Sequence, residues 1–405
     1  MAVKKYVLEE LEDLSCDEVK SYRRRAYRAF DSLQFEGNVL FQKYVESEGS
    51  FYTAGSPAYN TINLSKGNSI RIFSGSSEIF ESSSGLIVDD INGAVSKLEA
   101  VKSLLEKQQN DDKLESQVDA LFNNCTVLYV KKGENIKEPV SVDIKTGSSD
   151  PFLGKLIVFL EPDSSASVII RSGSEHTPPV FYGENIDLVV SEGASLEAVI
   201  IQNISQEASL SLNKRLSIAG KLRMTTVDFG GKVLRSRYSI NLIKEGAEAE
   251  INSVVAGNGS QSFDLTSNLN HKEKSTYSKV NMRAVLNDSS KSLFKGVIRQ
   301  EKNAVKSSAY LSEHSILLGK NAKSNSIPSL EIETDDVKAS HSASSHPVEE
   351  EKIFYLMSRG IERSDAIELI TFGFVNELLG AVASDDLEDI RRIFESKTAL
   401  KNTGE

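Results

Sequence analysis

The stretch SRYSINLIKEGAEAEINSVVA, residues 236–256, carries two short runs with the composition of β-strands. The runs SRYSINLI and EINSVVA contain Tyr, Ile and Val, which are enriched in strands, and the Lys, Glu and Gly between them favour a turn. The stretch therefore predicts a strand, a turn beside Gly246-Ala247 and a second strand.

Short strand-like runs of this kind continue from Thr126 to Val337, with turns of Gly, Asn, Asp, Ser and Lys between them. Further examples are KLIVFLE, DLVVSE and KVNMRAVL. No amphipathic helix of about 10–15 residues interrupts the span, which disfavours a doubly wound α/β fold. Such a long succession of short strands indicates a mainly β fold, which is a sandwich, a barrel or a solenoid.

The spacing of the turns distinguishes among these folds. Several turns place a polar residue or glycine before a small residue: Ser165-Ala166, Gly193-Ala194, Gly246-Ala247, Lys274-Ser275 and Asn303-Ala304. Their second members stand at positions 166, 194, 247, 275 and 304, and Ala219-Gly220 falls near the middle of the longest gap. A period near 27 fits one coil of a parallel β-helix, in which each coil buries its inward side chains on the next. Spacing alone leaves the solenoid and the sandwich equally open.

Helical patterns flank the β-rich span. Ser15-Cys16-Asp17-Glu18 has the sequence of a capping box, and residues 91–122 form a helical pattern with a break near 109–112. After Val348, three more helices are expected: the first begins at Glu349-Glu350-Glu351 and ends at Gly360, the second is capped by Ser364-Asp365, and the third starts at Ser384-Asp385-Asp386.

We therefore expect three domains. Residues 1–122 form a mostly helical region, residues 123–346 form the β core, and residues 347–405 form a C-terminal helical domain.

Composition excludes several classes of function. The net charge of −11 argues against nucleic-acid binding, and the run Arg23-Arg24-Arg25 with Arg28 is expected to be a solvated helix face or a partner contact. The longest apolar runs, such as LIVFL, are too short to cross a membrane, and no secretory signal is expected. The chain has two cysteines, Cys16 and Cys125, and no CxxC pair, which favours a reducing, cytoplasmic location.

Catalytic motifs are missing from the sequence. It has no P-loop, no GxGxxG after a strand and no GxSxG. A β-helix enzyme that acts on carbohydrate would place carboxylates in a groove. Such grooves usually also carry aromatic platforms, and this chain has no Trp and no clustered Tyr in its strands, so we expect no enzyme.

One long block of sequence resembles a known family. Residues 313–382 run from EHSILLGKNAKSNSIPSLEIETDDVKASHSA to EEEKIFYLMSRGIERSDAIELITFGFVNELLGAV. The pattern LEI-x-x-DDVK-x-SH, then EE-x-x-FYL-x-SRGI, then a helix with A-x-x-x-I-x-x-GF, resembles the C-terminal signature of the SufB/SufD family of iron–sulfur cluster assembly scaffolds. The likeness extends upstream through KLESQVDALFNNCTVLYVKKGENIKEPV, which resembles the same family. The run RRRAYRAFDSLQ resembles the SufD branch, although the likeness is weak before Leu114.

The resemblance implies a right-handed parallel β-helix between helical N-terminal and C-terminal parts. It implies a non-enzymatic scaffold that pairs through the end of its β-helix with a SufB-type paralogue or with a copy of itself. It also implies that the C-terminal helices dock a SufC-type ABC ATPase, whose ATP turnover rearranges the scaffold pair. A homodimer that acts without a separate SufB stays open.

The likeness also assigns candidate site residues. Glu313 occupies the position of a SufB-type cysteine that is implicated in cluster assembly. Ala339 replaces a cysteine that often precedes the histidine of the SufD motif by two positions, and His341 keeps that histidine. The likeness therefore implies that the partner supplies the cysteine, with His341 opposite it. His341 is the expected metal ligand for a transient iron–sulfur cluster at the subunit interface.

Strand geometry refines this assignment. His341 and His346 are separated by an odd number of positions, so on one strand they point to opposite faces and should not chelate one metal. Pro347 suggests that the strand has ended by His346. Glu313 and His314 precede His341 by about one coil, so one of them could stack beside it, and the family match favours Glu313.

The remaining candidates have ordinary structural explanations. His314 and His346 are expected to be structural or surface residues, His176 and His271 to lie in polar loops, and Asp335-Asp336 to form a turn. The predicted ATPase-docking region contains Phe354, Tyr355, Arg359, Gly360 and Phe374. Within it, Phe354, Tyr355 and Leu356 are expected to pack the C-terminal helices together rather than to contact the ATPase directly.

Overall fold

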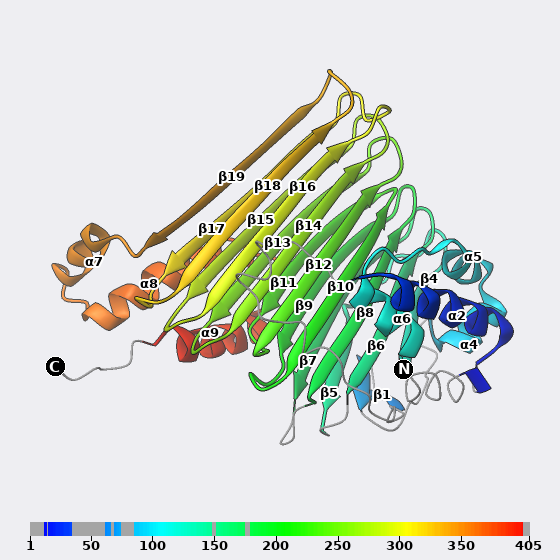
Figure 1. The fold of residues 1–405 in the computed structure, drawn as a ribbon, viewed down its shortest axis with the longest axis horizontal. Helices are drawn as coiled ribbons and strands as arrows, with labels where there is room; N and C mark the ends of the chain where they lie inside the picture. The colour runs from blue at the N-terminus through cyan, green and yellow to red at the C-terminus, as the bar shows by residue number, and fades with distance from the viewer. Residues whose placement is uncertain are drawn as a thin grey trace.

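The structure is a computed structural model that describes residues 12–13, 15–34, 61–65, 69–73, 85–147, 151–174 and 179–399. Two sheets dominate it, a ten-stranded sheet A and a nine-stranded sheet B (Figure 1). Sheet A contains, in spatial order, β1 (Thr61–Ser65), β2 (Ser69–Phe73), β5 (Val140–Thr146), β7 (Ser165–Ser174), β9 (Ser195–Asn203), β11 (Lys221–Asp228), β13 (Glu248–Gly257), β15 (Tyr277–Leu286), β17 (Ser308–Leu317) and β19 (Lys338–Pro347). Sheet B contains β3 (Leu86–Asp90), β4 (Asn124–Val130), β6 (Phe152–Leu160), β8 (Phe181–Val190), β10 (Ser209–Ile218), β12 (Val233–Leu242), β14 (Ser262–His271), β16 (Lys291–Gln300) and β18 (Lys323–Ile332).

From β4 onward the chain winds as a parallel β-helix, since successive strands alternate between the sheets and each pairs in parallel with the strand two places further along. Leu210 of β10, for example, lies beside Tyr182 of β8 and Leu234 of β12. The coil from Leu210 to Leu234 is shorter than the later coil from Ile298 to Leu330, and the predicted period lies between the two. The structure confirms the predicted solenoid, with a coil near the predicted length, and the alternative prediction of a β-sandwich is wrong.

The core lies inside the coils. Every second residue of a strand points inward, as Leu210, Leu212, Leu216 and Ile218 do on β10, and these side chains are buried in one continuous apolar cluster. Each such buried side chain contributes on the order of 1.5–3 kcal/mol. Stacked coils therefore provide the hydrophobic core that no single coil could form alone.

A column of left-handed residues explains the repeated turns. Gly133, Asp163, Gly193, Gly246, Ser275 and Lys306 all have positive φ at the same turn of their coils, whereas the coil between Gly193 and Gly246 turns at Ala219-Gly220 without a left-handed residue. The N–H of Gly246 donates to the carbonyl of Lys274 (3.2 Å), and that of Ser275 donates to the carbonyl of Val305 (2.9 Å), so the turn bonds each coil to the next. The predicted turn at Ser165-Ala166 is displaced, because Ser165 already begins β7 and Asp163 carries the left-handed conformation.

Within the described part of the N-terminal region, the helices α2 (Asp17–Ser32), α4 (Ile91–Lys97), α5 (Glu99–Lys107) and α6 (Lys113–Leu121) lie against sheet B. The predicted break before α6 is confirmed. The predicted capping box is wrong, since Cys16 is the N-cap of α2 and the hydroxyl of Ser15 instead accepts from Arg23 Nε (3.3 Å). Arg23 is also buried, donating to the carbonyls of Ala120 and Phe122, so it is not part of a solvated face.

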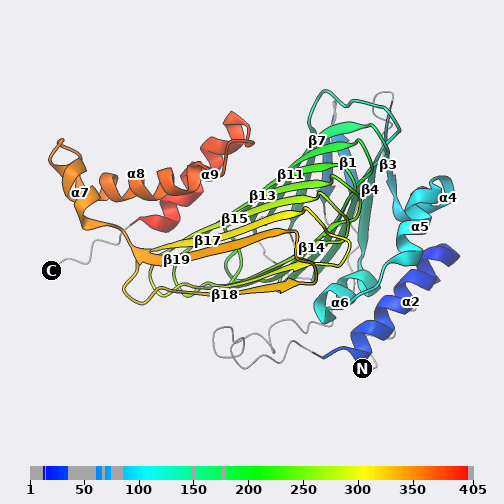
Figure 2. The same cartoon turned by 90° about the horizontal axis from the view of Figure 1, so that it is seen from above.

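Three C-terminal helices follow β19: α7 (Glu350–Met357), α8 (Arg363–Asn376) and α9 (Ser384–Thr398). Figure 2 shows α8 and α9 lying over one face of the β-helix, and their apolar side chains join the outward ones of sheet A in a cluster. Gly360 is left-handed just after α7, and α9 starts at Ser384, both as predicted. Ser364-Asp365 do not cap α8, because Glu362 is its N-cap and both residues lie in its first turn.

Candidate functional site at the open end of the β-helix

The two sheets end at β18 and β19, each of which pairs on one side only, and no further described strand lies beyond them (Figure 1). Side chains at positions that are buried in earlier coils are consequently exposed to solvent here. Ile298 of β16 is fully buried, whereas its neighbour Leu330 on β18 is 41% exposed and Ile332 is 48% exposed. An apolar interior that opens to solvent is the kind of surface that a protein partner covers.

His341 lies in this open end. It occupies the middle of β19 and pairs in register with Leu311, whose side chain faces the interior of the coil. His341 therefore faces the same interior, yet it is exposed because no described coil follows. Within the described residues, its imidazole has no hydrogen-bond partner, so it is available to a ligand or to a partner chain.

Glu313 faces the same interior from the preceding coil. It pairs in register with Ala343, two positions beyond His341, and its side chain is only 2% exposed. Its Oε2 accepts a hydrogen bond from the hydroxyl of Ser326 on β18, while Oε1 has no partner among the described residues. Burial raises the pKa of Glu313 and the Ser326 hydrogen bond lowers it, with burial dominant. This carboxyl therefore holds a proton more firmly than an exposed one.

Glu313 shares the face of His341, as the family match favoured, and His314 points outward, with its Nδ1 2.7 Å from the hydroxyl of Ser344. The expectation that one of the two stacks directly beside His341 is wrong. That place belongs to Leu311, because the coil between β17 and β19 is longer than the predicted period, and Glu313 lies diagonally across from His341.

The other candidate residues are structural. His346 lies on the outward face, within β19, which extends to Pro347 rather than ending before it. Asp335-Asp336 form a bend, as predicted. His271 is not in a loop: it ends β14, fully buried, with Thr276 and Ser278 each at 2.7 Å, and burial lowers its pKa to about 4. His176 lies outside the described residues.

The open end does not hold a complete metal site on its own. Among the described residues, no group of three or more His, Cys, Asp or Glu side chains is placed to hold a metal ion. Cys125 is buried among the N-terminal helices, and burial raises the pKa of its thiol to about 12, which makes it inert. His341 and Glu313 could contribute two ligands at most, so further ligands must come from outside these residues.

The predicted docking region carries an exposed apolar surface. Phe354 is 73% exposed and Tyr355 58%, with Met357 and Leu369 exposed nearby. The expectation that Phe354 and Tyr355 pack the helices is wrong, because Ile353 and Leu356 form the inward face of α7. Phe374 is half-buried against α9 and sheet A, Arg359 lies over the ring of Tyr355 (5.3 Å), and Gly360 begins the turn toward α8.

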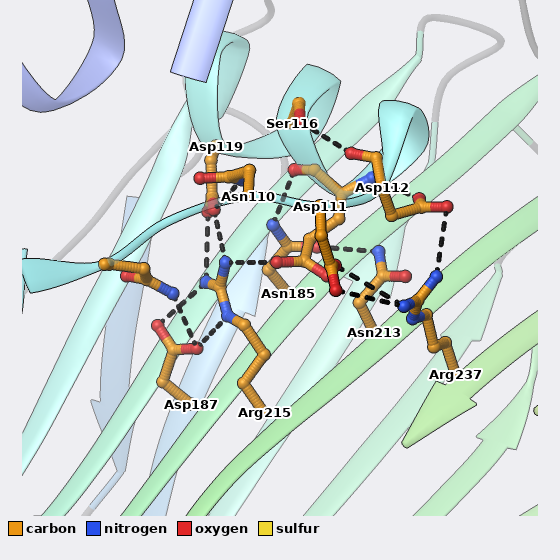
Figure 3. Close-up of polar contacts among 12 residues, drawn as sticks. Asn110, Asp111, Asp112, Ser116, Asp119, Asn185, Asp187, Asn213, Arg215 and Arg237 are labelled. Carbon is orange, nitrogen blue, oxygen red and sulfur yellow. Dashed lines mark hydrogen bonds and ion pairs between the residues drawn. The ribbon is translucent and has the colours of Figure 1, made fainter. Parts of the chain in front are cut away.

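Sequence reasoning missed a buried ionic cluster between α6 and sheet B (Figure 3). Arg215 of β10 donates to Asp119 and Glu115 of α6 and to Asp187 of β8, and Lys155 of β6 bridges Asp119 and Asp187. The available signal was the presence of Lys155 and Arg215 inside otherwise buried strands. Every charge has an opposite partner, so the cluster fastens α6 to the β-helix.

Arg235 makes a second link to α6. Its guanidinium donates to both carboxylate oxygens of Asp112 at 2.9 and 2.7 Å, and Asp112 also accepts from the N–H groups of Leu114 and Glu115 at the start of α6. Burial opposes ionisation of Asp112, but the charge and hydrogen bonds of Arg235 outweigh it and lower the pKa to about 2.

A groove of about 560 Å³ on the outer face of sheet A is the place where a carbohydrate enzyme would act. Two of its three carboxylates have a cationic neighbour: Lys221 binds Glu248 at 2.9 Å, and Arg223 lies 3.6 Å from Glu250. Its lining residues include no aromatic side chain, so the groove lacks the platforms that sugar rings need. The geometry gives that alternative no support.

Comparison with known proteins agrees with this architecture. The family described as "SUF system FeS cluster assembly, SufBD core domain" matches residues 144–374, more than half of the chain. Among the described helices, none combines the length and the apolar character needed to cross a bilayer.

Several relatives carry the same family name. SufD of Bacillus subtilis is 28% identical over 280 residues, covering 66% of this chain and 64% of that protein, a little under two thirds of its length. An iron–sulfur cluster assembly SufBD family protein of Mycobacterium bovis is 27% identical over 290 residues, or 69% of this chain and 72% of the relative. SufD of Escherichia coli is 33% identical over 159 residues, which cover 39% of this chain and 38% of that protein. The chain belongs to the SufB/SufD family of the SUF iron–sulfur cluster assembly system, and it is SufD-like.

Proposed function

We propose that this chain is a non-enzymatic scaffold subunit that pairs, through the open end of its β-helix, with a SufB-type paralogue and helps to assemble a transient iron–sulfur cluster there. The observation that carries the proposal is the position of His341, which faces the interior of an uncapped last coil. The partner would cover Leu330 and Ile332 and bring its own ligands to His341. Such assembly suits a reducing, cytoplasmic location.

A heterodimer fits this end better than a homodimer. Glu313 and Ala339 stand where other family members carry cysteines, so two copies of this chain would meet without a thiolate. Thiolates are the usual ligands of iron–sulfur clusters. Glu313, with its raised pKa, would serve as a proton donor beside the cluster rather than as a sulfur acceptor.

We further propose that α7 and the start of α8 dock a SufC-type ABC ATPase. The support is the exposed apolar patch of Phe354, Tyr355, Met357 and Leu369, which lies outside the core of the C-terminal helices. Helix α8 also contacts sheet A, where Arg283 donates to Glu377 (2.6 Å). A movement of the docked ATPase could therefore be passed to the coils near His341.

Substitution of His341 tests the cluster role. His341→Ala should lower the yield of cluster assembled by the co-purified complex at least tenfold while leaving the complex intact. His346→Ala, on the opposite face of the same strand, is the matched control and should retain the yield. An unchanged yield in His341→Ala would remove this residue from the mechanism.

Co-purification tests the docking role. Phe354→Ser combined with Tyr355→Ser should abolish capture of the ATPase from a co-expressing cell, because both exposed rings would lose their apolar contacts. Thermal unfolding should not change, since neither ring is buried in the chain itself. Ser358→Ala, on the same helix end, is the control. Full ATPase capture by the double variant would contradict the assignment.

A further inference from the structure

The outer face of the late coils carries a row of polar side chains that ends on β19. Arg283 of β15, His314 of β17 and Ser344 of β19 pair in register, so their side chains lie next to one another on one face of sheet A. The strand β19 also carries His341, on its other face. Contacts that hold β19 from outside therefore also set the position of His341.

Apolar packing holds β19 only weakly. Among the described residues of this strand, Ala339 alone packs against the apolar core, and it is only partly buried. The other inward side chains, those of His341, Ala343 and Ser345, are exposed. Because β19 also bonds to a neighbouring strand on one side only, side-chain hydrogen bonds matter more for its placement than in the buried coils.

His314 contacts β19 at two points. Its Nδ1 lies 2.7 Å from the hydroxyl oxygen of Ser344, and its Nε2 lies 3.3 Å from that of Ser342. Both ring nitrogens thus have a hydroxyl partner, one on each side of Ala343. The hydroxyl of Tyr310 lies 3.1 Å from the same oxygen of Ser342. These contacts join β17 to β19 in addition to the backbone ladder.

Arg283 connects the row to α8, which lies near the ends of the late strands (Figure 2). Its guanidinium donates to the carbonyl of Phe374 and to Oε2 of Glu377 (2.6 Å). Burial lowers the pKa of His314, and the neighbouring charges of Arg283 and His346 lower it further. The imidazole is therefore neutral at pH 7, with one ring nitrogen as donor and the other as acceptor.

We propose that His314 is a positioning residue, which holds β19 through two serine hydroxyls and thereby sets the place of His341. This inference rests on the proposed function, because it takes His341 as the residue that acts on the cluster. Since Arg283 bonds to α8, the same row joins the end of that helix to the strand that carries His341.

Hydrogen exchange on the full chain alone tests the hold on β19. The N–H of Lys338 donates to the carbonyl of Ser307 (2.9 Å), so the even-numbered amides of β19 face β17. In His314→Leu, their protection relative to an unstructured chain should fall roughly fivefold, because both imidazole contacts are lost. His314→Asn, which places an amide near the position of Nδ1, should keep most of the protection. The amides of β15 should not change in either variant.

A double-mutant cycle identifies the contact that is responsible. Ser344→Ala should lower the protection of β19 roughly threefold in the unchanged chain but have no further effect in His314→Leu, because the same hydrogen bond is already lost. Ser340→Ala, on the same face of the same strand, is the matched control. It should leave the protection unchanged with either residue at position 314.

Acid supplies a readout that shape alone would not change. Because folding lowers the pKa of His314 from 6.5, protonation opposes the folded arrangement as the pH falls below that value. Protection of β19 should drop roughly twofold from pH 7.5 to 5.5 in the wild type but not in His314→Asn. The charged groups that face His314 are Arg283 and His346, and Glu377 pairs with Arg283 from α8. Arg283→Met should therefore reduce the drop, while His346 is kept in every variant.

Cluster yield of the co-purified complex separates the two levels of the proposal. His314→Leu should lower the yield roughly threefold, and His314→Asn should restore it. Unchanged β19 protection in His314→Leu, or the same acid response in wild type and His314→Asn, would overturn the inference. So would a loosened β19 with full yield, provided that His341→Ala lowers the yield. Full yield in His341→Ala would instead overturn the proposed function and leave the hold on β19 in place.

Discussion

Glu184 illustrates what a single buried residue does to this protein. Its carboxyl lies inside the β-helix, and burial raises its pKa to about 7, although Tyr182 donates a hydrogen bond to it (3.1 Å) and Lys214 lies near. A carboxyl whose pKa is raised by folding stabilises the fold only while it is protonated. Its contribution is present below its unfolded pKa and is lost as the pH rises through about 7.

Glu184→Gln should remove this dependence on pH. Between pH 4 and pH 8, the wild type should lose about 3 kcal/mol more of its free energy of unfolding than the variant does. Urea unfolding at both pH values measures the difference. Glu197→Gln, exposed on the outer face of β9, is the control and should show no such change, whereas a pH-independent difference for Glu184→Gln would contradict the prediction.

Substitution of two glycines distinguishes the effect of backbone conformation on stability from the effect of side-chain packing. Gly246 has a φ of +76° and Gly373 lies in helix α8, and a Cβ added to either would meet nothing within 4 Å. Gly246→Ala should destabilise the protein by about 1 kcal/mol, because only the left-handed backbone opposes it. Gly373→Ala should stabilise it by about 1 kcal/mol through helix propensity. Thermal unfolding checks both, and equal effects would contradict the turn assignment.

At the level of single elements, the attachment of α6 depends on charge. Asp112→Asn keeps an oxygen for the helix cap but removes the nearest charged partner of the buried Arg235 and leaves it only the longer contact to Asp264 (3.5 Å). The free energy of unfolding should therefore fall by about 1.5–3 kcal/mol. Asp111→Asn is the matched control, since Asp111 is exposed and 3.4 Å from Arg237, and it should cost at most about 1 kcal/mol. Urea unfolding at pH 7 measures both.

The pair of Asp112 and Arg235 also predicts that acid weakens the attachment of α6 to the β-helix. Because Arg235 lowers the pKa of Asp112 to about 2, the stabilisation is present above the unfolded pKa of 3.8 and is lost as the pH falls through 2. The difference between wild type and Asp112→Asn should therefore shrink in that interval. A difference that is as large at pH 2 as at pH 7 would show that the pair acts through shape rather than charge.

Across the molecule as a whole, the C-terminal helices are fastened to coils that are far apart in the sequence. Arg171 of β7 donates to both oxygens of Asp386 in α9, at 2.6 and 2.8 Å, while Asn287, just after β15, donates to the carbonyl of Lys397 (3.2 Å). Helix α9 therefore spans the outer face of sheet A from the early coils to the late ones.

Arg171→Met should loosen α9 while leaving the β-helix folded. Amides of residues 384–398 should exchange at least tenfold faster, because a charge pair of low exposure is lost, and the strand amides should keep their protection. Arg223→Met, also on the outer face of sheet A but paired with Glu250 at 3.6 Å in solvent, is the control. Unchanged exchange in α9 would show that apolar packing alone holds it.

The outcome for individual residues shows which features can be predicted from a sequence. Gly193 and Gly246 marked the coil because a left-handed turn requires glycine or a residue that tolerates strain. The opposite faces of His341 and His346 followed from the pleat alone. Phe354 and Tyr355 were misplaced because apolar character does not tell which side of α7 meets the core. Arg23 and Arg215 were missed as buried residues because their burial depends on partners distant in the chain.

Local pattern and backbone geometry were enough to predict the alternation of strand and turn, the approximate length of a coil and the opposite faces of His341 and His346 on one strand. The three-dimensional packing was needed to show that Leu311 rather than Glu313 stands beside His341. That neighbour depends on how many residues the turns before β19 contain, since one extra residue shifts the register of the whole next strand.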